Sequence, residues 1–405
     1  MPDIIAIGGG QASFSFISKL RSLGYQKPIS LICGENHIPY QRPPLSKKFL
    51  IGELEKDRLF FKPQGFYDEQ NIEVIKGQIV KKIDRRQSKI ILDNEKVLNY
   101  KTLFLGLGSR SRLLPKNLSN GITKLYYIRE IGDISLIAKE FSYKRKLIIL
   151  GGGFIGLEVA SVARKFGVDV IILESQERIL KRTSAKIVAN HVKKIHLSNG
   201  VLIKENTSIK KFLKTKNNSI SILTNKNEEL LADFMIAGIG AQPNTEIADN
   251  AGLLVDNGIV VDENCRTSDP NIFAAGDCVS FPFNKELTRL ENVGNAIEQS
   301  ETASENILGK DIKYQPVPWF WSDQFDIKLQ IVGLNKGFTK VFHRQNGQKN
   351  SFWYYKDDKL ISVEAINDPQ SYMVGKKLLE MKKTPSPKDI VSNKINLKDM
   401  LREIK

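Results

Sequence analysis

Two glycine-rich turns, each between an apolar run and a helix-like segment, constrain the fold more than any other feature. The first, Gly8-Gly9-Gly10-Gln11-Ala12-Ser13, follows Ile4–Ile7, and the second, Gly151-Gly152-Gly153-Phe154-Ile155-Gly156, follows Leu147–Leu150. In both cases a second apolar strand follows and ends in an acid, Glu35 or Glu174. Glycines let the backbone approach a pyrophosphate, the helix N-terminus stabilises its charge, and the acid accepts hydrogen bonds from ribose hydroxyls. Two such units predict two dinucleotide cofactors, for which a flavin and a nicotinamide are the economical pair.

The length of the chain sets the number of domains. With 405 residues it is too long for a single core and suits about three domains. We predict an α/β fold with two Rossmann-like dinucleotide-binding domains and a small α+β C-terminal domain. The predicted boundaries are 1–110 with 240–310 for a discontinuous first domain, 111–239 for the second, and 311–405 for the C-terminal domain.

Local patterns predict several elements within these domains. Thr102–Leu105 and Phe234–Ala237 are typical of buried strands, and Ser46 is a candidate helix cap after a proline-stiffened loop. Further helices are expected at 156–166, at 184–197, at 296–308 and from Pro369 onward. A β-meander is expected at 202–223, with a polar turn at 214–218, and a hairpin is expected from strands at 351–356 and 359–365.

The chain is strongly basic. Its 61 Lys and Arg residues against 45 Asp and Glu residues give a net charge of +16. A basic surface favours acidic partners, nucleic acid or anionic membranes. Lysine, isoleucine and asparagine are frequent throughout, so charge spread over solvated faces explains the composition equally well. Both interpretations stay open.

The three cysteines, Cys33, Cys265 and Cys278, lie far apart and form no Cys-x-x-Cys motif. This argues against a structural zinc site and against a local dithiol relay, and we expect no metal. Sparse unpaired cysteines fit a reducing cytosol, so we expect a cytoplasmic protein. Cys33 and Cys278 are expected as packing residues.

Neither a signal peptide nor a membrane span is expected. An apolar strand begins almost at Met1, and no apolar run approaches the length that a membrane span needs. The four histidines show no ligand spacing and are expected at the surface or in loops: His37, His191, His196 and His343.

Motifs along nearly the whole chain carry a family resemblance. They are Arg42-Pro43-Pro44-Leu45-Ser46-Lys47, Gly151 to Glu158, Ala237-Gly238-Ile239-Gly240, Asp256 to Val260, Ala275-Gly276-Asp277-Cys278, Arg289 to Val293, and Trp319-Phe320-Trp321-Ser322-Asp323-Gln324. With them the chain resembles the NADH-dependent ferredoxin reductases of oxygenase systems, the putidaredoxin reductase and biphenyl dioxygenase reductase group. More broadly it resembles the two-dinucleotide flavoproteins of glutathione-reductase type.

The resemblance implies FAD in the first site and NADH in the second. The implied FAD contacts are Gly8, Gly10, Ala12, Glu35, Arg42, Lys47, Val80, Arg129, Asp277 and Val293. The implied NADH contacts are Gly153, Phe154, Ile155, Glu158, Glu174, Arg182 and Gly238, beside Gly151 and Gly156 of the glycine turn.

The resemblance also implies catalytic roles. It places the Lys47 ammonium near flavin N5, where it stabilises negative charge on the reduced ring, and pairs it with Glu158. Trp319 and Trp321 are implied as a wall over the flavin edge and an exit for electrons. Asp277 is implied to meet the flavin ribityl chain or phosphate region. A simple helix N-cap is the other role expected for it, and the two roles can coexist.

Two positions depart from the family pattern. Ser13 stands where the first fingerprint has Gly or Ala, and its hydroxyl is expected to loosen helix-to-strand packing. Gly106-Leu107-Gly108 stands where the family usually has Ala-Thr-Gly, which removes a threonine hydroxyl near the flavin.

The missing dithiol directs the functional hypothesis. Electrons that reach the flavin must leave singly to an external carrier, or pass to oxygen. The leading hypothesis is a ferredoxin--NAD(+) reductase that transfers hydride from NADH to FAD and single electrons to an acidic [2Fe–2S] ferredoxin. The alternatives are a rubredoxin reductase or NADH oxidase and, less favoured, a flavoprotein like apoptosis-inducing factor. We expect no nucleic-acid partner, no membrane partner, and a monomer or weak dimer.

Overall fold

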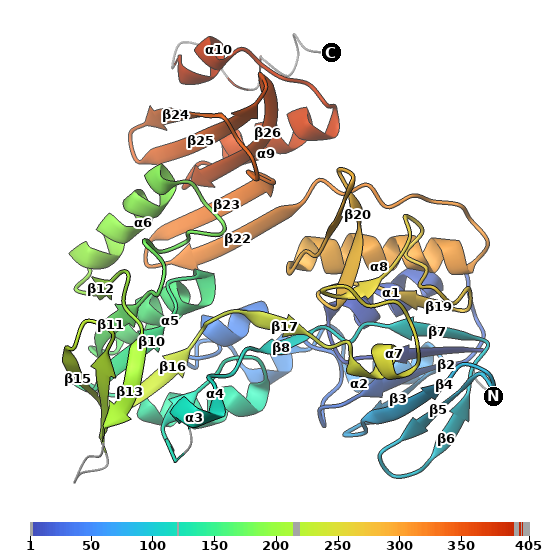
Figure 1. Cartoon of the computed structure of the whole chain (residues 1–405). Helices are drawn as coiled ribbons and strands as arrows, with labels where there is room; N and C mark the ends of the chain where they lie inside the picture. Colours follow the sequence, from blue (N-terminus) through green and yellow to red (C-terminus); the bar gives the residue numbers. More distant parts are fainter. Residues whose placement is uncertain (1–2, 120, 214–218, 393–396, 398, 400–405) are drawn as a thin grey trace. The chain divides into compact units, whose positions relative to one another are not determined.

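The computed structural model describes residues 3–119, 121–213, 219–392, 397 and 399, which group into two compact units (Figure 1). Unit 1 comprises Met1–Arg42, Leu54–Arg110 and Ala241–Pro318, and unit 2 comprises Pro43–Glu53, Ser111–Gly240 and Trp319–Lys405. The segment Pro43–Glu53 therefore groups with unit 2. The division into three domains stays a prediction, and the polar turn expected at 214–218 lies outside the described residues.

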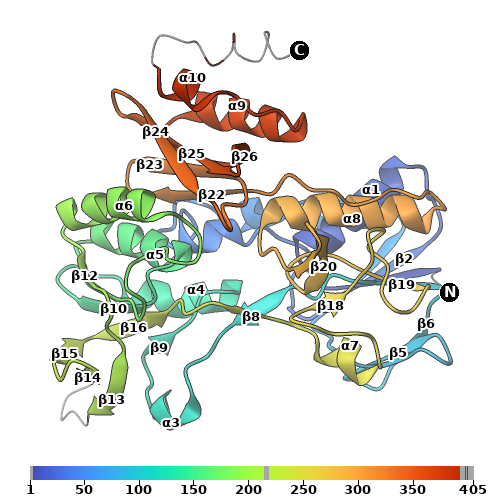
Figure 2. The same cartoon turned by 45° about the horizontal axis from the view of Figure 1, so that its top comes forward.

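Unit 1 is built on a parallel five-stranded sheet with the order β19-β7-β1-β2-β3. Its strands are β1 (Ile4–Ile7), β2 (Ile29–Cys33), β3 (Ile72–Lys76), β7 (Thr102–Leu105) and β19 (Ile272–Ala274). All residues of β1, β2 and β19 are buried, as their apolar sequences require, and Ser30 is the one polar residue among them. Helices α1 (Gln11–Ser22) and α8 (Val293–Ile307) pack side by side (Figures 1 and 2). The predicted strand at 102–105 is confirmed.

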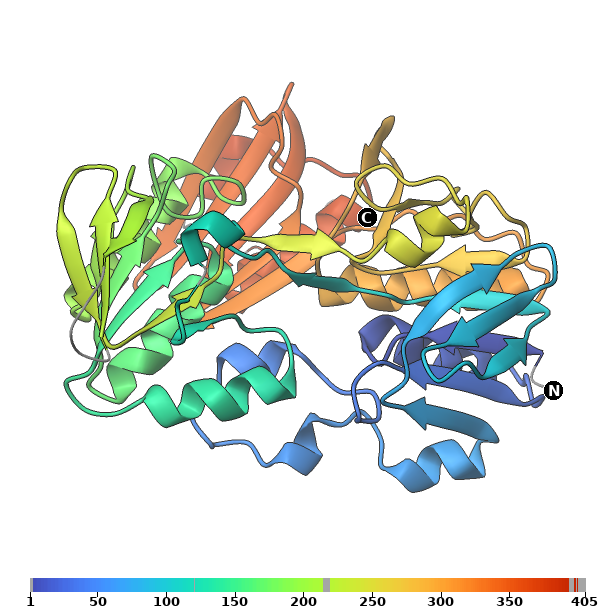
Figure 3. The same cartoon turned by 60° about the horizontal axis from the view of Figure 1, so that its bottom comes forward.

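Smaller sheets and helices complete unit 1. Strands β4, β5 and β6 form an antiparallel sheet, drawn in cyan in Figure 3, and β18-β20-β21 and β17-β8 form two more. The bounds of these elements are β4 (Val80–Asp84), β5 (Lys89–Leu92), β6 (Val97–Asn99), β8 (Ser109–Ser111), β17 (Ala241–Pro243), β18 (Ile259–Val260), β20 (Val279–Phe283), β21 (Glu286–Thr288), η2 (Lys56–Leu59), α2 (Gln64–Glu69) and α7 (Glu246–Asn250).

Unit 2 begins with a second parallel sheet, in the order β12-β11-β10-β16-β9, and a three-stranded antiparallel sheet, β13-β14-β15. Ile222 and Met235 lie in the core that the two sheets share. The strands are β9 (Leu125–Tyr126), β10 (Lys146–Leu150), β11 (Asp169–Leu173), β12 (Leu202–Lys204), β13 (Ile209–Leu213), β14 (Ile220–Thr224), β15 (Glu229–Ala232) and β16 (Phe234–Ala237). The helical segments are η1 (Pro43–Ser46), α3 (Lys116–Ser119), α4 (Ile131–Ile137), η3 (Ala138–Glu140), α5 (Phe154–Lys165) and α6 (Lys186–Ser198).

The C-terminal part of unit 2 is an antiparallel sheet with the order β22-β23-β26-β25-β24. The strands are β22 (Trp319–Gln324), β23 (Ile327–Gly333), β24 (Lys340–Asn346), β25 (Lys349–Lys356) and β26 (Lys359–Ile366). Helix α9 (Pro369–Glu380) packs on β23 and β26, and α10 (Pro387–Val391) packs on β24 (Figure 2). The hairpin predicted near 357 is confirmed, since Asp357 and Asp358 both have positive φ, as a tight hairpin turn requires.

Helix starts follow their local signals. Pro369 opens α9 as predicted, and the Asp368 side chain accepts a hydrogen bond from the Ser371 amide. Within the part of the chain that the structure describes, no helix is long and apolar enough to cross a membrane.

Candidate functional site

The first glycine turn is shaped to leave the start of α1 open. Gly8 has φ +120°, and a Cβ there would lie 2.1 Å from the Gly106 carbonyl oxygen. Gly10 is the N-cap of α1, no side chain caps it, and a Cβ at Gly10 would meet nothing within 4 Å. The first backbone N–H groups of this 12-residue helix therefore lack a side-chain cap. This arrangement fits the pyrophosphate of a dinucleotide.

The two departures from the family pattern compensate each other. Ser13 is fully buried on α1, and a Cβ at Gly106 would lie 2.4 Å from its Oγ. Gly106 therefore provides the space that the Ser13 hydroxyl occupies. This space, which lies just after β7, argues against the expectation that Ser13 loosens the packing of α1.

The acid at the end of β2 is held by two neighbours. Glu35 Oε2 accepts a hydrogen bond from the Tyr40 hydroxyl at 2.7 Å, and Arg42 Nη2 lies 2.7 Å from Glu35 Oε1. The Arg42 guanidinium also lies over the Tyr40 ring, 5.0 Å from its centroid. Two of the predicted FAD contacts, Glu35 and Arg42, thus form one fixed pair.

The other predicted FAD contacts are divided between the units. Unit 1 holds Ala12 on α1, Val80 at the start of β4, Asp277 and Val293, and unit 2 holds Lys47 and Arg129. Asp277 Oδ2 accepts a hydrogen bond from Ser109 Oγ at 2.8 Å. No helix begins at Asp277, since β20 follows it, so the N-cap alternative is wrong.

The second glycine turn repeats the first in unit 2. Gly151 has φ +101°, and a Cβ there would lie 2.4 Å from the Gly238 carbonyl oxygen. A Cβ at Gly156 would lie 2.2 Å from the Gly151 oxygen, so α5 packs against the turn more closely than any side chain allows. Gly153, the uncapped N-cap of α5, faces open space like Gly10. The turn fits a second pyrophosphate.

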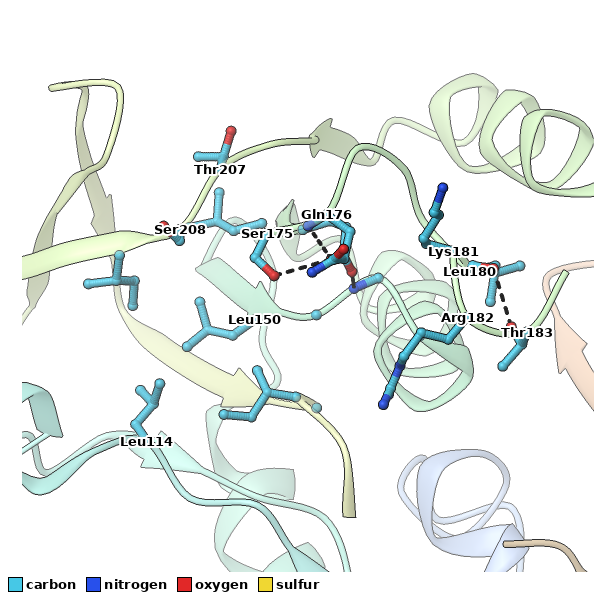
Figure 4. Close-up of a pocket in the computed structure, with 18 of the residues that line it drawn as sticks. Leu114, Leu150, Ser175, Gln176, Leu180, Lys181, Arg182, Thr183, Thr207 and Ser208 are labelled. Atoms are coloured by element: carbon cyan, nitrogen blue, oxygen red, sulfur yellow. Dashed lines mark hydrogen bonds between the residues drawn. The ribbon is translucent and has the colours of Figure 1, made fainter. Parts of the chain in front are cut away.

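A cavity of about 470 Å³ opens over this turn (Figure 4). Arg182 lies on one side of it, and Leu114 and Leu150 lie on the other (Figure 4). Five predicted residues line it: Gly151, Gly153, Glu174, Arg182 and Gly238. Four others lie on α5 and do not line this cavity: Phe154, Ile155, Gly156 and Glu158.

Glu174 is fixed at the edge of the cavity by backbone amides. Its Oε2 accepts from the Gly152 amide at 2.8 Å and its Oε1 from the Gln176 amide at 2.7 Å. Arg178, by contrast, donates to the carbonyls of Ile179, Leu180, Lys181 and Ser184. Arg178 therefore folds the loop that carries Arg182, and Arg182 is the arginine that lines the cavity.

A buried carboxylate, Glu158, lies at the centre of a second polar cluster. Lys47 Nζ lies 2.7 Å from Glu158 Oε2, so the ion pair expected from the resemblance is present. Ser46 Oγ donates to the same oxygen at 2.6 Å, and Ser322 Oγ donates to Oε1 at 2.6 Å. Both oxygens of a carboxylate that is only 3% exposed are thus satisfied by side chains. Ser46 does not cap a helix, so its predicted role is wrong.

A chain of hydrogen bonds continues from this cluster into the interior. Gln324 Nε2 donates to Ser322 Oγ at 3.0 Å, and Gln324 Oε1 lies 2.9 Å from His196 Nε2. Because an amide oxygen only accepts, His196 donates from Nε2. Every donor from His196 onward therefore points toward Glu158, an order in which each bond polarises the next. Burial lowers the pKa of His196 to about 4, which keeps the ring neutral.

The position of His196 corrects the sequence prediction. The side chain is fully buried on α6, where the sequence analysis expected a surface or loop histidine. The sequence analysis did not predict a role for Ser322 or Gln324, and their place in the tryptophan motif is the one sequence feature that points to them.

The tryptophans of β22 form a stacked pair. The Trp319 and Trp321 ring centroids are 5.7 Å apart with an interplanar angle of 24°, and Lys376 Nζ lies 5.6 Å from the Trp319 centroid. Phe320 packs against Phe154 with centroids 4.6 Å apart.

All three cysteines are unpaired and buried, which agrees with the packing role predicted for Cys33 and Cys278. Burial raises the pKa of Cys33 and of Cys278 to about 12, and it raises that of Cys265 further. Burial therefore disfavours the thiolate form at all three positions, which argues against a nucleophilic cysteine here.

Comparison with known proteins agrees with this geometry. The pyridine nucleotide-disulphide oxidoreductase model matches residues 2–300, and the reductase C-terminal model matches residues 319–401. Rhodocoxin reductase of Rhodococcus erythropolis is 35% identical over 98% of this chain and 93% of its own length. Putidaredoxin reductase CamA of Pseudomonas putida is 33% identical over 100% of this chain and 97% of its own length.

The fold of the chain is also very similar to that of a solved structure. The chain superposes with a TM-score of 0.95 and 32% identity on the reductase of a covalent putidaredoxin reductase–putidaredoxin complex, covering 99% of this chain and 98% of that one. The chain belongs to the pyridine nucleotide-disulphide oxidoreductase family. It is an oxidoreductase with the predicted two-dinucleotide fold and a C-terminal reductase domain, and it uses FAD and NAD(H).

Proposed function

We propose that the chain is an NADH:ferredoxin oxidoreductase of an oxygenase or cytochrome P450 system. Bound FAD would supply the chemistry that takes a hydride from NADH and passes its two electrons on singly. The balanced reaction consumes one NADH and two oxidised ferredoxins, and yields NAD⁺, two reduced ferredoxins and one proton.

One observation carries the choice of an external one-electron acceptor. The family takes its name from disulphide chemistry, yet the three cysteines of this chain are isolated, buried and protonated at neutral pH. Electrons therefore have no internal disulfide to reduce. The likeness to a reductase that was solved in complex with putidaredoxin supports a ferredoxin as the acceptor.

We assign the catalytic roles to Lys47 and Glu158. The ammonium supplies positive charge where hydride transfer to a flavin develops negative charge, and Glu158 fixes its position. Ser46 and Ser322 hold the carboxylate, so that its charge is compensated within a buried cluster. The nucleotide cavity of unit 2, with Glu174 and Arg182, is assigned to NADH, and the glycine turn of unit 1, with Glu35 and Arg42, is assigned to FAD.

Acceptor choice tests the proposal. NADH-dependent cytochrome c reduction is measured with a purified [2Fe–2S] ferredoxin, with rubredoxin, and with neither. We expect fast reduction through the ferredoxin and two ferredoxins reduced per NADH. Faster transfer to rubredoxin or to oxygen would move the assignment to a rubredoxin reductase or an NADH oxidase, and a salt-sensitive DNA shift with weak turnover would favour the third alternative.

The docking surface is proposed to include the Trp319–Trp321 pair and to attract an acidic ferredoxin. Lys376 lies at this pair, whereas the adjacent Lys377 is bonded to Glu380. We expect Lys376→Gln to raise the KM for ferredoxin and to weaken its dependence on ionic strength, and the matched Lys377→Gln variant to do less. A salt response that is flat in the parent enzyme would remove the electrostatic part of the proposal.

A cytoplasmic location accompanies this function. Three unpaired thiols fit a reducing compartment, which also supplies NADH. Cell fractionation with an antibody to the chain tests the location.

A further inference from the structure

The loop that lines the nucleotide cavity rests on the C-terminal sheet. Leu180, Lys181, Arg182 and Thr183 line the cavity (Figure 4). Directly after them, the Ala185 amide donates to the Tyr354 hydroxyl of β25 at 3.3 Å. The nucleotide loop, residues 178–185, is therefore held partly by side chains that lie outside the second Rossmann unit.

Asn335 and Glu364 make the central contact. Asn335 lies between β23 and β24, and its Nδ2 donates to the Thr183 carbonyl at 3.0 Å and to Glu364 Oε1 at 2.8 Å. Glu364, on β26, is fully buried, and its Oε2 has no hydrogen-bond partner among the described residues. A buried carboxyl group thus fixes the amide that fixes the nucleotide loop.

We propose that Glu364 and Asn335 are positioning residues for the nucleotide loop, through which the C-terminal sheet sets the affinity of the cavity for NAD(H). This inference rests on the proposed assignment of the cavity to NADH. Arg182 reaches the cavity from the segment that Asn335 anchors, so a shift of Thr183 moves the neighbouring Arg182 backbone.

The carboxyl group makes this coupling sensitive to pH. Burial raises the pKa of Glu364 to about 7, against the opposing influence of Tyr354, Ser184, Asn335 and the positive charge of Arg178. Of these neighbours, Arg178 in the loop and Tyr354 on β25 are the titratable groups that face it. Ionisation above this pH places a charge in a fully buried site beneath the loop, which favours opening of the loop to water. The KM for NADH should therefore rise between pH 6 and pH 8.

Four variants test the proposal on the holoenzyme. Asn335→Leu keeps the size of the side chain but removes both donors, and we expect a rise of about 3- to 10-fold in the KM for NADH with little change in kcat. Glu364→Gln keeps an acceptor for Asn335 and cannot ionise, so its KM should stay constant from pH 6 to pH 8. Glu380→Gln, the same substitution on the exposed side of α9, is the matched control and should keep the parent pH profile. Arg182→Ala tests the cavity itself.

The outcomes separate the inference from the proposed function. NAD⁺ binding to each oxidised variant is measured by calorimetry, and thermal unfolding confirms that each variant is folded. If Arg182→Ala weakens NAD⁺ binding and Asn335→Leu leaves it unchanged, the positioning role is wrong and the cavity assignment stands. If neither weakens binding, the cavity assignment itself is wrong. A parent KM that is constant from pH 6 to pH 8 would overturn the role of Glu364 ionisation.

Discussion

Glu174 should make the enzyme prefer NADH to NADPH. Its carboxylate is 9% exposed, and the Gly152 and Gln176 amides hold it in one orientation at the edge of the nucleotide cavity. A ribose diol can donate hydrogen bonds to this group, whereas the 2′-phosphate of NADPH meets like charge. Arg178 cannot offset that repulsion, because its guanidinium is bonded to loop carbonyls.

The size of the preference follows from the partial exposure of the site. Two unit charges about 4 Å apart repel by about 1 kcal/mol in water and by about 4 kcal/mol near a protein surface. Glu174 is mostly buried but lines an open cavity that also contains Arg182, so an intermediate value of about 2–3 kcal/mol applies. This corresponds to a preference of about 30- to 150-fold in kcat/KM.

Glu174→Gln removes the charge and keeps the shape of the side chain. We expect kcat/KM for NADPH to rise by about the same factor, while NADH loses a few-fold because the amide accepts ribose hydrogen bonds less well. The control is Glu95→Gln, whose exposed carboxylate pairs with Lys81 and does not line the cavity, and it should leave the ratio unchanged. Equal kcat/KM values for the two cofactors in the parent enzyme, or a lead for NADPH, would refute the reasoning.

Three further predictions follow from the packing and the polar clusters. Lys47→Met should retain FAD but slow flavin reduction by NADH about 100-fold in stopped-flow measurements, because Glu158 loses its cation; an unchanged rate would remove Lys47 from the catalytic site. Gly106→Ala should destabilise the protein by about 1–3 kcal/mol, because its Cβ would lie 2.4 Å from Ser13 Oγ. Thermal unfolding should show that Ser13→Ala in the same chain recovers most of this loss, and purely additive effects would contradict the compensation. Since burial lowers the pKa of His196 to about 4, the unfolded chain takes up a proton that the folded chain excludes as pH falls from 6.5 to 4. Stability should fall by about 2 kcal/mol between pH 7 and pH 5 in denaturant unfolding, and His196→Gln should lack that loss.

The features that the sequence predicts well are those with local causes. A glycine turn after an apolar run needs no distant partner, because the strand, the positive φ and the helix start are all specified within about 15 residues. The same holds for the Asp357–Asp358 hairpin and for Pro369. These local signals were sufficient for the two Rossmann-like units and for one hairpin of the C-terminal sheet, but not for its strands β22, β23 and β24.

The errors have distant causes. Ser13 is a defect only if position 106 carries a Cβ, and here it does not. His196 has a polar neighbourhood on α6, yet the partner that permits its burial, Gln324, lies 128 residues further along the chain. Burial of a polar side chain depends on whether the fold supplies a hydrogen-bond partner, and a single sequence does not reveal that.

The cluster around Glu158 shows how far a motif extends beyond its best-known residues. The resemblance assigns a role in electron exit to the tryptophans of the segment Trp319–Gln324. The hydrogen bonds from β22 to Glu158 and His196, however, are made by Ser322 and Gln324. Ser46 does the same for the proline-rich loop, next to Lys47. The proline-rich loop and β22 thus meet at one carboxylate on α5 and each contributes a donor to it, while His196 on α6 extends the chain behind β22. Burying a carboxylate without these donors would cost free energy of folding. The polar residues of the motifs are therefore needed to keep the Lys47–Glu158 pair in place, and the proposed hydride transfer depends on that pair.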